Sequence, residues 1–349
     1  MTATLAASWY TDPEVLRDEQ RLIFRDAWQY AGRAEQVAEP GSYLTAELGA
    51  VPVVVVRGRD GALRGFANVC RHRGHLVMSG AGRCTTLQCP YHAWTYDLDG
   101  SLRAAPRGEH EPGFSRDGLA LVPVAVDTWG PFVFARAAAD GPSLAEALGE
   151  LPGVLESSGV RLDGLRHVRR VQWTLDANWK AAIENYLECY HCPTAHPGLA
   201  KLFDVSAEAY ALHTGERVSW QIGPRRDGRP AGTFLDAGEI AAAHWMWAWP
   251  NLTLNVEPGA QNLSIDAWFP DGPSRTRGVT DYFFGDGVGD DVVEGVLEFS
   301  RSVGEEDARL VASVQRGLAS GMVPEGRLMP ESERLIAHFQ ALVRAALDR

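Results

Sequence analysis

The sequence predicts an α+β protein of two domains, a small all-β unit followed by a larger unit of mixed helices and strands. A chain of 349 residues is long enough for two hydrophobic cores. Between about residues 41 and 135, short β-branched runs alternate with turn residues, which is typical of antiparallel strands. Beyond residue 141, helical and strand-like patterns are mixed.

The spacing of apolar residues along the chain indicates where the helices and strands lie. Residues 13–30 place Val15, Leu16, Leu22, Ile23 and Trp28 among charges at helical spacing, so an amphipathic helix is expected there. We expect the domains to divide as a helical segment 1–38 packed on the second domain, an all-β domain 39–140 and an α+β domain 141–349. The α+β domain is expected to contain strands near 167–178 and 208–285 and helices near 179–190, 290–320 and 331–348.

Composition excludes several classes of protein. A formal charge of -12 argues against nucleic acid as a partner, because phosphate binding needs a basic face. No apolar run is long enough to cross a bilayer, and the N-terminus lacks the pattern of a signal peptide, so no membrane partner and a cytoplasmic location are expected. The five cysteines are an odd number, which argues against a disulfide scaffold.

Two Cys/His pairs in the first domain carry the clearest chemical signal. "CRHRGH" holds Cys70 and His72, and sixteen residues later "CPYHAW" holds Cys89 and His92. Two thiolates and two imidazoles can bind zinc, but zinc fingers usually pair like ligands. One cysteine and one histidine on each loop suit a [2Fe-2S] centre in which two cysteines hold one iron and two histidines hold the other.

A second ligand set is spread over the second domain. A helix with Asn178 as its N-cap leads to His191 and His196, which a regular helix would hold about 140° apart. Pro193 and Pro197 interrupt the helix, and the break can bring the two imidazoles together. Two histidines and one carboxylate commonly hold iron that activates O2. Asp307, at the centre of an apolar helical stripe, is the predicted carboxylate, with a buried ion pair as the alternative.

Both regions resemble one family. "CRHRGH" and "GAGRCTTLQCPYHAWTYDLDGSLRAAP" resemble the Rieske signature of the α subunits of Rieske non-heme iron oxygenases, the aromatic-ring-hydroxylating dioxygenase family. "NWKAAIENYLECYHCPTAH" and the distant Asp307 are similar to the catalytic domain of that family, and the resemblance covers roughly residues 8–339. It implies a Rieske [2Fe-2S] domain followed by a helix-grip (START-like) catalytic domain with a mononuclear iron site.

The resemblance also implies roles for single residues. Cys70 and Cys89 would bind one cluster iron, and His72 and His92 the other. The mononuclear Fe(2+) would be held by His191, His196 and Asp307. Glu188, which helical spacing directs outward, would connect the two centres across a subunit boundary of a homotrimer, and Asn178 would support the site. Glutamate in "ECYHC", where most members have aspartate, resembles the branch that acts on choline, carnitine and betaines.

The reaction implied is O2- and NAD(P)H-dependent hydroxylation or oxidative N-demethylation of a small quaternary ammonium or N-methyl compound. Trp245, Trp247 and Trp249 alternate along one strand and could wall a cation pocket, or could simply face the core. An aromatic or natural-product substrate, and a Rieske electron-transfer protein without oxygenase activity, are the alternatives. NAD(P)H would act through a separate ferredoxin or flavin reductase, which arginines near the cluster segment could attract: Arg71, Arg73, Arg83, Arg103 and Arg107.

One further pair of cysteines invites a redox interpretation. Cys189 and Cys192 are three apart, but the sequence lacks the βαβ pattern that surrounds a thioredoxin-like motif. We therefore expect both to be packing residues.

Overall fold

The structure, a computed structural model, describes residues 2–347. The chain forms two compact units: one comprises residues 20–147, and the other comprises the residues up to Glu19 and those from Leu148 onward. The sequence-based boundaries, after residues 38 and 140, stay predictions of where the folding domains divide. The predicted α+β class is confirmed, since one unit is built on strands and the other combines a large sheet with helices.

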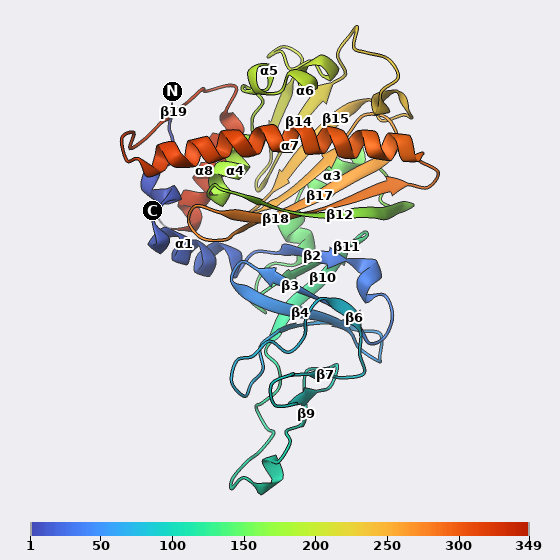
Figure 1. Ribbon diagram of the computed structural model, residues 1–349, viewed down its shortest axis with the longest axis vertical. Helices are drawn as coiled ribbons and strands as arrows, with labels where there is room; N and C mark the ends of the chain where they lie inside the picture. Colours follow the sequence, from blue (N-terminus) through green and yellow to red (C-terminus); the bar gives the residue numbers. More distant parts are fainter. Residues whose placement is uncertain (1, 348–349) are drawn as a thin grey trace. The chain divides into compact units, whose positions relative to one another are not determined.

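A seven-stranded antiparallel sheet forms the core of the 20–147 unit (Figure 1). An inner strand of this sheet, β4 (Val51–Arg57), reads "VPVVVVR", and all four valines from Val53 to Val56 are fully buried because both faces of the sheet are covered. Val54 and Val56 pack in one cluster with Cys70 and Cys89. The spatial order is β2 (Gln29–Arg33), β11 (Phe132–Arg136), β10 (Pro123–Trp129), β5 (Leu63–Ala67), β4 (Val51–Arg57), β3 (Ser42–Leu48) and β6 (Ala81–Arg83).

A second, three-stranded sheet in this unit carries one of the Cys/His loops. Its strands are β7 (Leu87–Gln88), β8 (Thr95–Tyr96) and β9 (Leu102–Ala104), and the loop 89–94 connects the first two. The short remaining elements of the unit are η2 (Gln20–Phe24), η3 (Ala34–Val37), η4 (Gly108–His110) and most of α2 (Leu144–Leu148).

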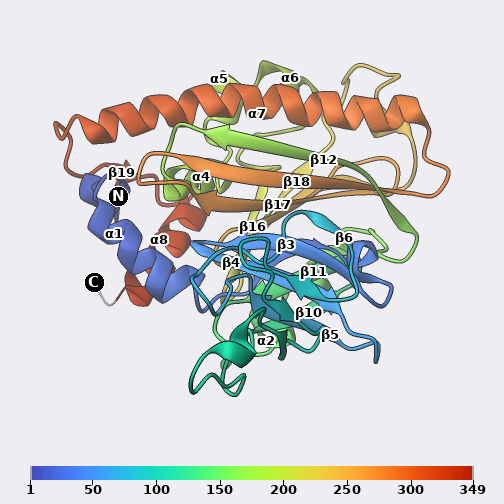
Figure 2. The same cartoon turned by 60° about the horizontal axis from the view of Figure 1, so that its bottom comes forward.

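The other unit is a seven-stranded antiparallel sheet with the long helix α7 (Asp290–Ala319) lying across one face (Figures 1 and 2). This arrangement matches the predicted helix-grip domain. Strand order is β12 (Leu165–Leu175), β18 (Thr276–Gly285), β17 (Asn262–Pro270), β16 (Leu252–Val256), β15 (Ala242–Ala248), β14 (Val218–Pro224) and β13 (Ala211–Thr214). The shorter helices are α3 (Leu151–Ser157), α4 (Trp179–Tyr186), α5 (Cys192–Ala195), α6 (Pro197–Leu202) and α8 (Arg334–Ala346).

The N-terminal helix is shorter than its apolar spacing predicts. After a 3-10 turn η1 (Ala7–Tyr10), α1 spans only Pro13–Glu19 and continues as a π-helical turn, η2, before the chain enters strand β2. Residues 29–33 therefore belong to a sheet edge, because pairing with β11 outweighs a local helical pattern. Strand β1 (Thr2–Ala3) pairs with β19 (Arg327–Leu328), and η5 spans Phe234–Asp236.

Hydropathy gives one further result. Within residues 2–347 no helix combines the length and the apolar character needed to cross a bilayer.

Candidate functional site

The two Cys/His loops of the 20–147 unit have the same backbone conformation. In each loop the N–H of the cysteine donates to the carbonyl five residues later, His75 O in one and Trp94 O in the other. In each, the N–H four residues after the cysteine donates back to the cysteine carbonyl. The residue at that fourth position has a left-handed backbone, with φ of 74° at Gly74 and 58° at Ala93. The two loops are therefore local repeats of one turn.

These turns bury the thiols and expose the imidazoles. Cys70 and Cys89 are 3% and 2% exposed, whereas His72 and His92 lie at the surface with ring centroids 4.7 Å apart. The hydroxyl of Tyr96 lies 3.3 Å from Cys70 Sγ and accepts the N–H of Arg71 at 2.9 Å. Burial raises the pKa of the Cys89 thiol, so a thiolate there needs a compensating positive charge. Two buried sulfurs beneath two adjacent imidazoles fit a [2Fe-2S] group with mixed ligands.

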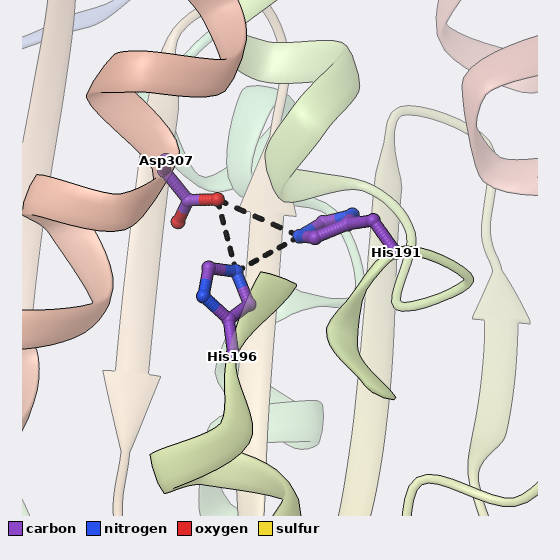
Figure 3. Close-up of side chains that lie close together, drawn as sticks. All are labelled: His191, His196 and Asp307. Atoms are coloured by element: carbon purple, nitrogen blue, oxygen red, sulfur yellow. Dashed lines mark hydrogen bonds and ion pairs between the residues drawn. The ribbon is translucent and has the colours of Figure 1, made fainter. Parts of the chain in front are cut away.

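A second cluster of metal-ligating side chains lies in the other unit. Helix α4 ends at Tyr186, and the chain then turns through His191 into the short helices α5 and α6, which meet at His196. Asp307 comes from the middle of α7, more than 100 residues later, and points at both imidazoles (Figure 3). The break at Pro193 and Pro197 thus brings the two histidines together, as the sequence suggested.

The distances within this cluster are those of a metal site. His191 Nε2 and His196 Nε2 are 3.0 Å apart, and Asp307 Oδ1 lies 3.0 Å from His196 Nε2 and 3.5 Å from His191 Nε2. Two ligands about 2.1 Å from one metal and at right angles are about 3.0 Å apart. The three atoms are therefore spaced as one face of a coordination sphere requires, and their types are those of the 2-His-1-carboxylate pattern of non-heme iron.

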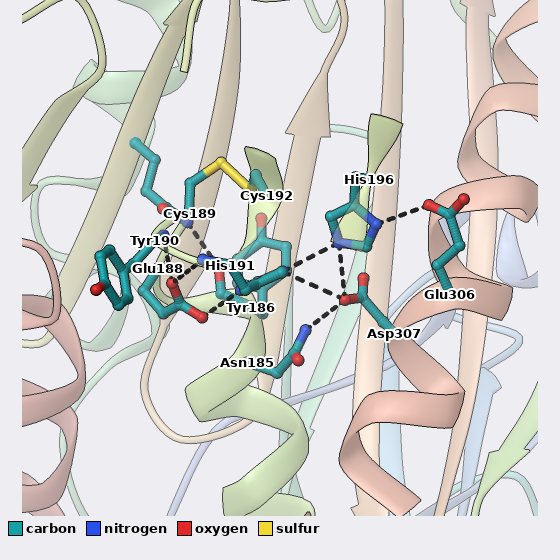
Figure 4. Close-up of polar contacts among 11 residues, drawn as sticks. Asn185, Tyr186, Glu188, Cys189, Tyr190, His191, Cys192, His196, Glu306 and Asp307 are labelled. Atoms are coloured by element: carbon teal, nitrogen blue, oxygen red, sulfur yellow. Dashed lines mark hydrogen bonds and ion pairs between the residues drawn. A yellow bond between two sulfur atoms is a disulfide. The ribbon is translucent and has the colours of Figure 1, made fainter. Parts of the chain in front are cut away.

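Each ligand is oriented by a further polar group (Figure 4). The Nδ1 atom of His191 bonds the Glu188 carboxylate, and Nδ1 of His196 lies 2.7 Å from Glu306 Oε2. Asn185 Nδ2 donates to Asp307 Oδ1 at 2.7 Å. Such partners fix the tautomer and the direction of a ligand and raise its basicity.

Electrostatics keep the carboxylate ionised. Burial of Asp307 opposes ionisation, but the imidazoles of His191 and His196 outweigh it and lower the pKa to about 2. Burial alone would lower the pKa of His191. The carboxylates of Asp307 and Glu188 raise it by more, so the pKa rises to about 9. The two imidazoles thus lie among three carboxyl groups, those of Glu188, Glu306 and Asp307.

Glu188 does not point away from the protein as helical spacing predicted. Because α4 ends at Tyr186, the helical count no longer applies at Glu188, whose side chain is 10% exposed and also accepts the backbone N–H of His191. Tyr190, which also lies beyond the end of α4, is 61% exposed. Glu188 thus contacts the iron-site histidine within its own chain.

Cys189 and Cys192 pack in a buried hydrophobic cluster, as expected, but they are not two separate thiols. The two residues form a disulfide that spans the turn carrying His191. Cys70, Cys84 and Cys89 are free. The loop conformation that brings Cys189 and Cys192 together is set by tertiary packing, and the sequence spacing alone could not separate a bridge from two packed thiols.

Asn178 and Asn185 have different positions in the site. Asn178 is the buried N-cap of α4: its Oδ1 accepts the Lys180 N–H and its Nδ2 donates to carbonyls of Tyr10 and Pro273. It does not line the cavity beside the histidines, whereas Asn185 does. Asn185 and Glu306 were not selected from the sequence, although Asn185 is the last residue of the quoted "NWKAAIEN" run and Glu306 adjoins Asp307.

A cavity of about 570 Å³ opens beside the three ligands. Aromatic side chains from the sheet and α4 line it, and their polar ends are already bonded: Tyr186 to Asn255, Tyr210 to Gln221, Trp245 to Glu257 and Trp268 to Thr253. Trp247 and Trp249 pack against Phe339 instead, so only Trp245 of the predicted tryptophan face lines the cavity.

Fold and site together define a protein with a Rieske-type cluster loop pair and a separate facial-triad iron site. The sequence matches the family Ring hydroxylating alpha subunit (catalytic domain) over residues 162–349 and the Rieske [2Fe-2S] domain over residues 27–123. The chain belongs to the family of Rieske oxygenase α subunits, and it is the oxygenase component of such a system.

Individual relatives are similar over nearly the whole chain. The carnitine monooxygenase oxygenase subunit of Acinetobacter pittii is 33% identical over 97% of this chain and 94% of that protein. The chloroplastic choline monooxygenase of Arabidopsis thaliana is 34% identical over 98% of this chain and 82% of that protein. The quaternary ammonium Rieske monooxygenase CntA, solved with L-carnitine, is 33% identical over 99% of this chain and 96% of that chain, with a TM-score of 0.85.

Proposed function

We propose that this oxygenase hydroxylates, or oxidatively N-demethylates, a small quaternary ammonium or N-methyl compound. The observation that carries the proposal is the cavity beside the facial triad, which combines aromatic walls with buried carboxyl groups. Aromatic faces attract ammonium groups, and the worth of each contact reaches about 2 kcal/mol when water is excluded. The relatives named for carnitine and choline support the same class of substrate.

We propose the ligands by position. Cys70, His72, Cys89 and His92 would hold the [2Fe-2S] cluster, and His191, His196 and Asp307 would hold the mononuclear iron. The bound iron would supply the oxidising chemistry by activating O2.

The protein residues would orient and protect this chemistry. Glu188 and Glu306 would hold the Nδ1 atoms of the two histidines, so that each Nε2 stays free as a ligand. Asn185 would hold Asp307 in place. The apolar lining of the cavity would exclude bulk water and place the substrate next to the three ligands. Asn178, which anchors the start of α4, would act only by positioning that helix.

Electron supply would need other chains. We propose that a ferredoxin or flavin reductase passes electrons from NAD(P)H to the cluster, attracted by exposed arginines: Arg71, Arg73, Arg83, Arg103 and Arg107. We also propose a homotrimer in which electrons pass from the cluster of one chain, through Glu188, to the mononuclear iron of the neighbouring chain. Inter-subunit electron transfer is described for a quaternary ammonium Rieske monooxygenase 31% identical to this chain. Dependence on NAD(P)H is consistent with a cytoplasmic location.

Metal analysis and a substrate screen test the proposal. Purified protein should contain three irons per chain and show the red-brown colour of a Rieske cluster. With a reconstituted reductase, oxygen uptake should rise with choline or carnitine and yield an oxidised or demethylated product in proportion. A chain with two irons and no oxygen uptake would be an electron carrier. If only aromatic compounds are oxidised, the proposal that the substrate is an ammonium compound is wrong.

A further inference from the structure

A buried carboxylate in the cavity lacks a partner for one of its oxygens. Glu257, directly after strand β16, is 4% exposed and lines the cavity. Trp245 Nε1 donates to Oε1 at 3.2 Å, but Oε2 is buried without a hydrogen bond. An unpaired buried carboxylate is costly to retain. It is therefore a candidate for binding a ligand.

Two hydrogen bonds fix the backbone of Glu257. Its N–H donates to Asn262 Oδ1 at 2.9 Å, and its carbonyl accepts Asn262 Nδ2 at 2.8 Å. The neighbouring carboxyl group in the cavity, Asp266, differs because it accepts bonds from Thr253, Asn255 and Thr280. Asp266 is thus satisfied by the fold, whereas Glu257 is not.

The ring of Trp245 is held beside the same carboxylate. Gly223 lies under this ring, and a Cβ there would come within 2.6 Å of it. The rings of Tyr210 and Trp245 are nearly parallel, with an interplanar angle of 21° and centroids 6.0 Å apart. A carboxylate at the edge of one electron-rich ring, with a second ring parallel to the first, is a surrounding that attracts a cation.

Positive groups in the cavity wall are already paired. Arg169 Nη2 lies 2.8 Å from Glu294, and Arg301 binds Glu298 and Glu305 at 2.6 and 2.5 Å. Among residues 2–347, these are the two arginines that line the cavity, and no lysine lines it. A substrate carboxylate would therefore find no unpaired cationic side chain in this wall.

We propose that Glu257 is the anionic anchor of the cavity and that, with the ring of Trp245, it binds the ammonium group of a substrate that carries no carboxylate. This inference rests on the proposed function, and it adds the residue and the charge type that the cavity selects. The substrate class is then a choline-like cation rather than a carnitine-like zwitterion.

Ligand binding to iron-loaded protein without O2 tests this inference apart from turnover. Three probes have related shapes: choline is a cation, 3,3-dimethylbutan-1-ol is its neutral isostere, and carnitine is a zwitterion. Calorimetry should give wild-type protein a dissociation constant for choline at least about tenfold below those of the other two, since one desolvated charge contact is worth about that factor or more.

Variants assign the selectivity to one residue. Glu257→Gln should weaken choline binding roughly 10- to 100-fold and leave the neutral alcohol within about twofold. Trp245→Leu should weaken choline several-fold through lost cation–π attraction. The matched control is Glu331→Gln, which removes a charge from an exposed glutamate that pairs with Arg334 and does not line the cavity, and it should change choline affinity less than about twofold.

The outcomes separate the two proposals. Unchanged choline affinity in Glu257→Gln, or a wild-type preference for carnitine or the neutral alcohol, would overturn the role of Glu257 while ammonium oxidation stands. If wild-type protein neither binds nor oxidises any ammonium compound, the proposed function fails and the inference with it. The wild-type comparison needs no variant, so a poorly folded Glu257→Gln protein leaves the test intact.

Discussion

The two candidate metal sites are built in opposite ways. The Cys/His loops place all four side chains within 23 residues, from Cys70 to His92, on two turns with the same hydrogen bonds. The His191, His196 and Asp307 site joins a broken helix to a residue 111 positions after His196. The first is a local structure repeated twice, and the second exists only when α7 packs on the sheet. Local geometry should therefore govern one site, and long-range packing the other.

Removing the long-range ligand should have the largest effect. In Asp307→Ala protein, we expect iron content to fall from three to two per chain and O2-dependent turnover to fall by more than about 100-fold, since ligands matter more than their supporting partners. The visible absorbance of the cluster should remain. Loss of both the absorbance and the third iron would show that the two sites do not form independently.

Partners of the ligands should have a smaller effect. Glu306→Gln should weaken iron binding at the facial triad roughly 10- to 100-fold, because a neutral amide replaces the carboxylate that orients the ring of His196 and raises its basicity. The control is Glu305→Gln on the same helix, which contacts Arg301 and not His196. Chelator titration followed by iron analysis measures the difference, and equal iron loss in both variants would contradict the assigned role of Glu306.

In the cavity beside the His191, His196 and Asp307 site, we expect the buried carboxyl group of Glu257 to lower the free energy of unfolding at neutral and alkaline pH. Burial raises the pKa of Glu257 to about 7 from 4.5, so the folded state binds this proton more tightly than the unfolded state. Its destabilising contribution is nearly absent at pH 4, grows as pH rises from about 4.5 to about 7, and stays constant at higher pH. Glu257→Gln should therefore increase the free energy of unfolding at pH 8 by up to about 3 kcal/mol.

Denaturant unfolding at pH 4 and pH 8 measures this effect, and equal effects of the substitution at both pH values would contradict it.

The side chains that surround Glu257 supply no positive charge. They are the hydroxyls of Tyr186, Tyr210 and Tyr282, whose pKa values lie above the ordinary range, together with Trp245, Asn255, Asn262, Ser264, Val296 and Ser300.

Exchanging residues between the two turns should have the smallest effect. Gly74→Ala places a side chain on a left-handed backbone where a Cβ meets nothing within 4 Å, so the cost is conformational, about 1 kcal/mol. Ala93→Gly relieves the same strain and should be neutral or stabilising by up to about 1 kcal/mol. Thermal unfolding followed by cluster absorbance compares them, and the same sign in both would contradict the equivalence of the turns.

Much of this protein could be predicted from local patterns. Strand β4 follows from a run of valines, and α4 from an N-cap followed by apolar residues at helical spacing. The candidate cluster ligands were selected because a cysteine followed closely by a histidine occurs twice within a short segment. The prediction of Glu188 as outward failed because a helical count was extended beyond Tyr186, where α4 ends.

The sequence by itself determined the periodicities, the turns and the identity of the residues able to bind metal, because these depend on neighbours within a few positions. Long-range packing sets which side chains meet: Glu306 rather than Asn178 contacts His196, Trp245 lines the cavity while Trp247 is buried, and Glu257 keeps an unpaired oxygen. Those outcomes depend on how side chains far apart in the sequence pack, and a local pattern carries no information about that packing.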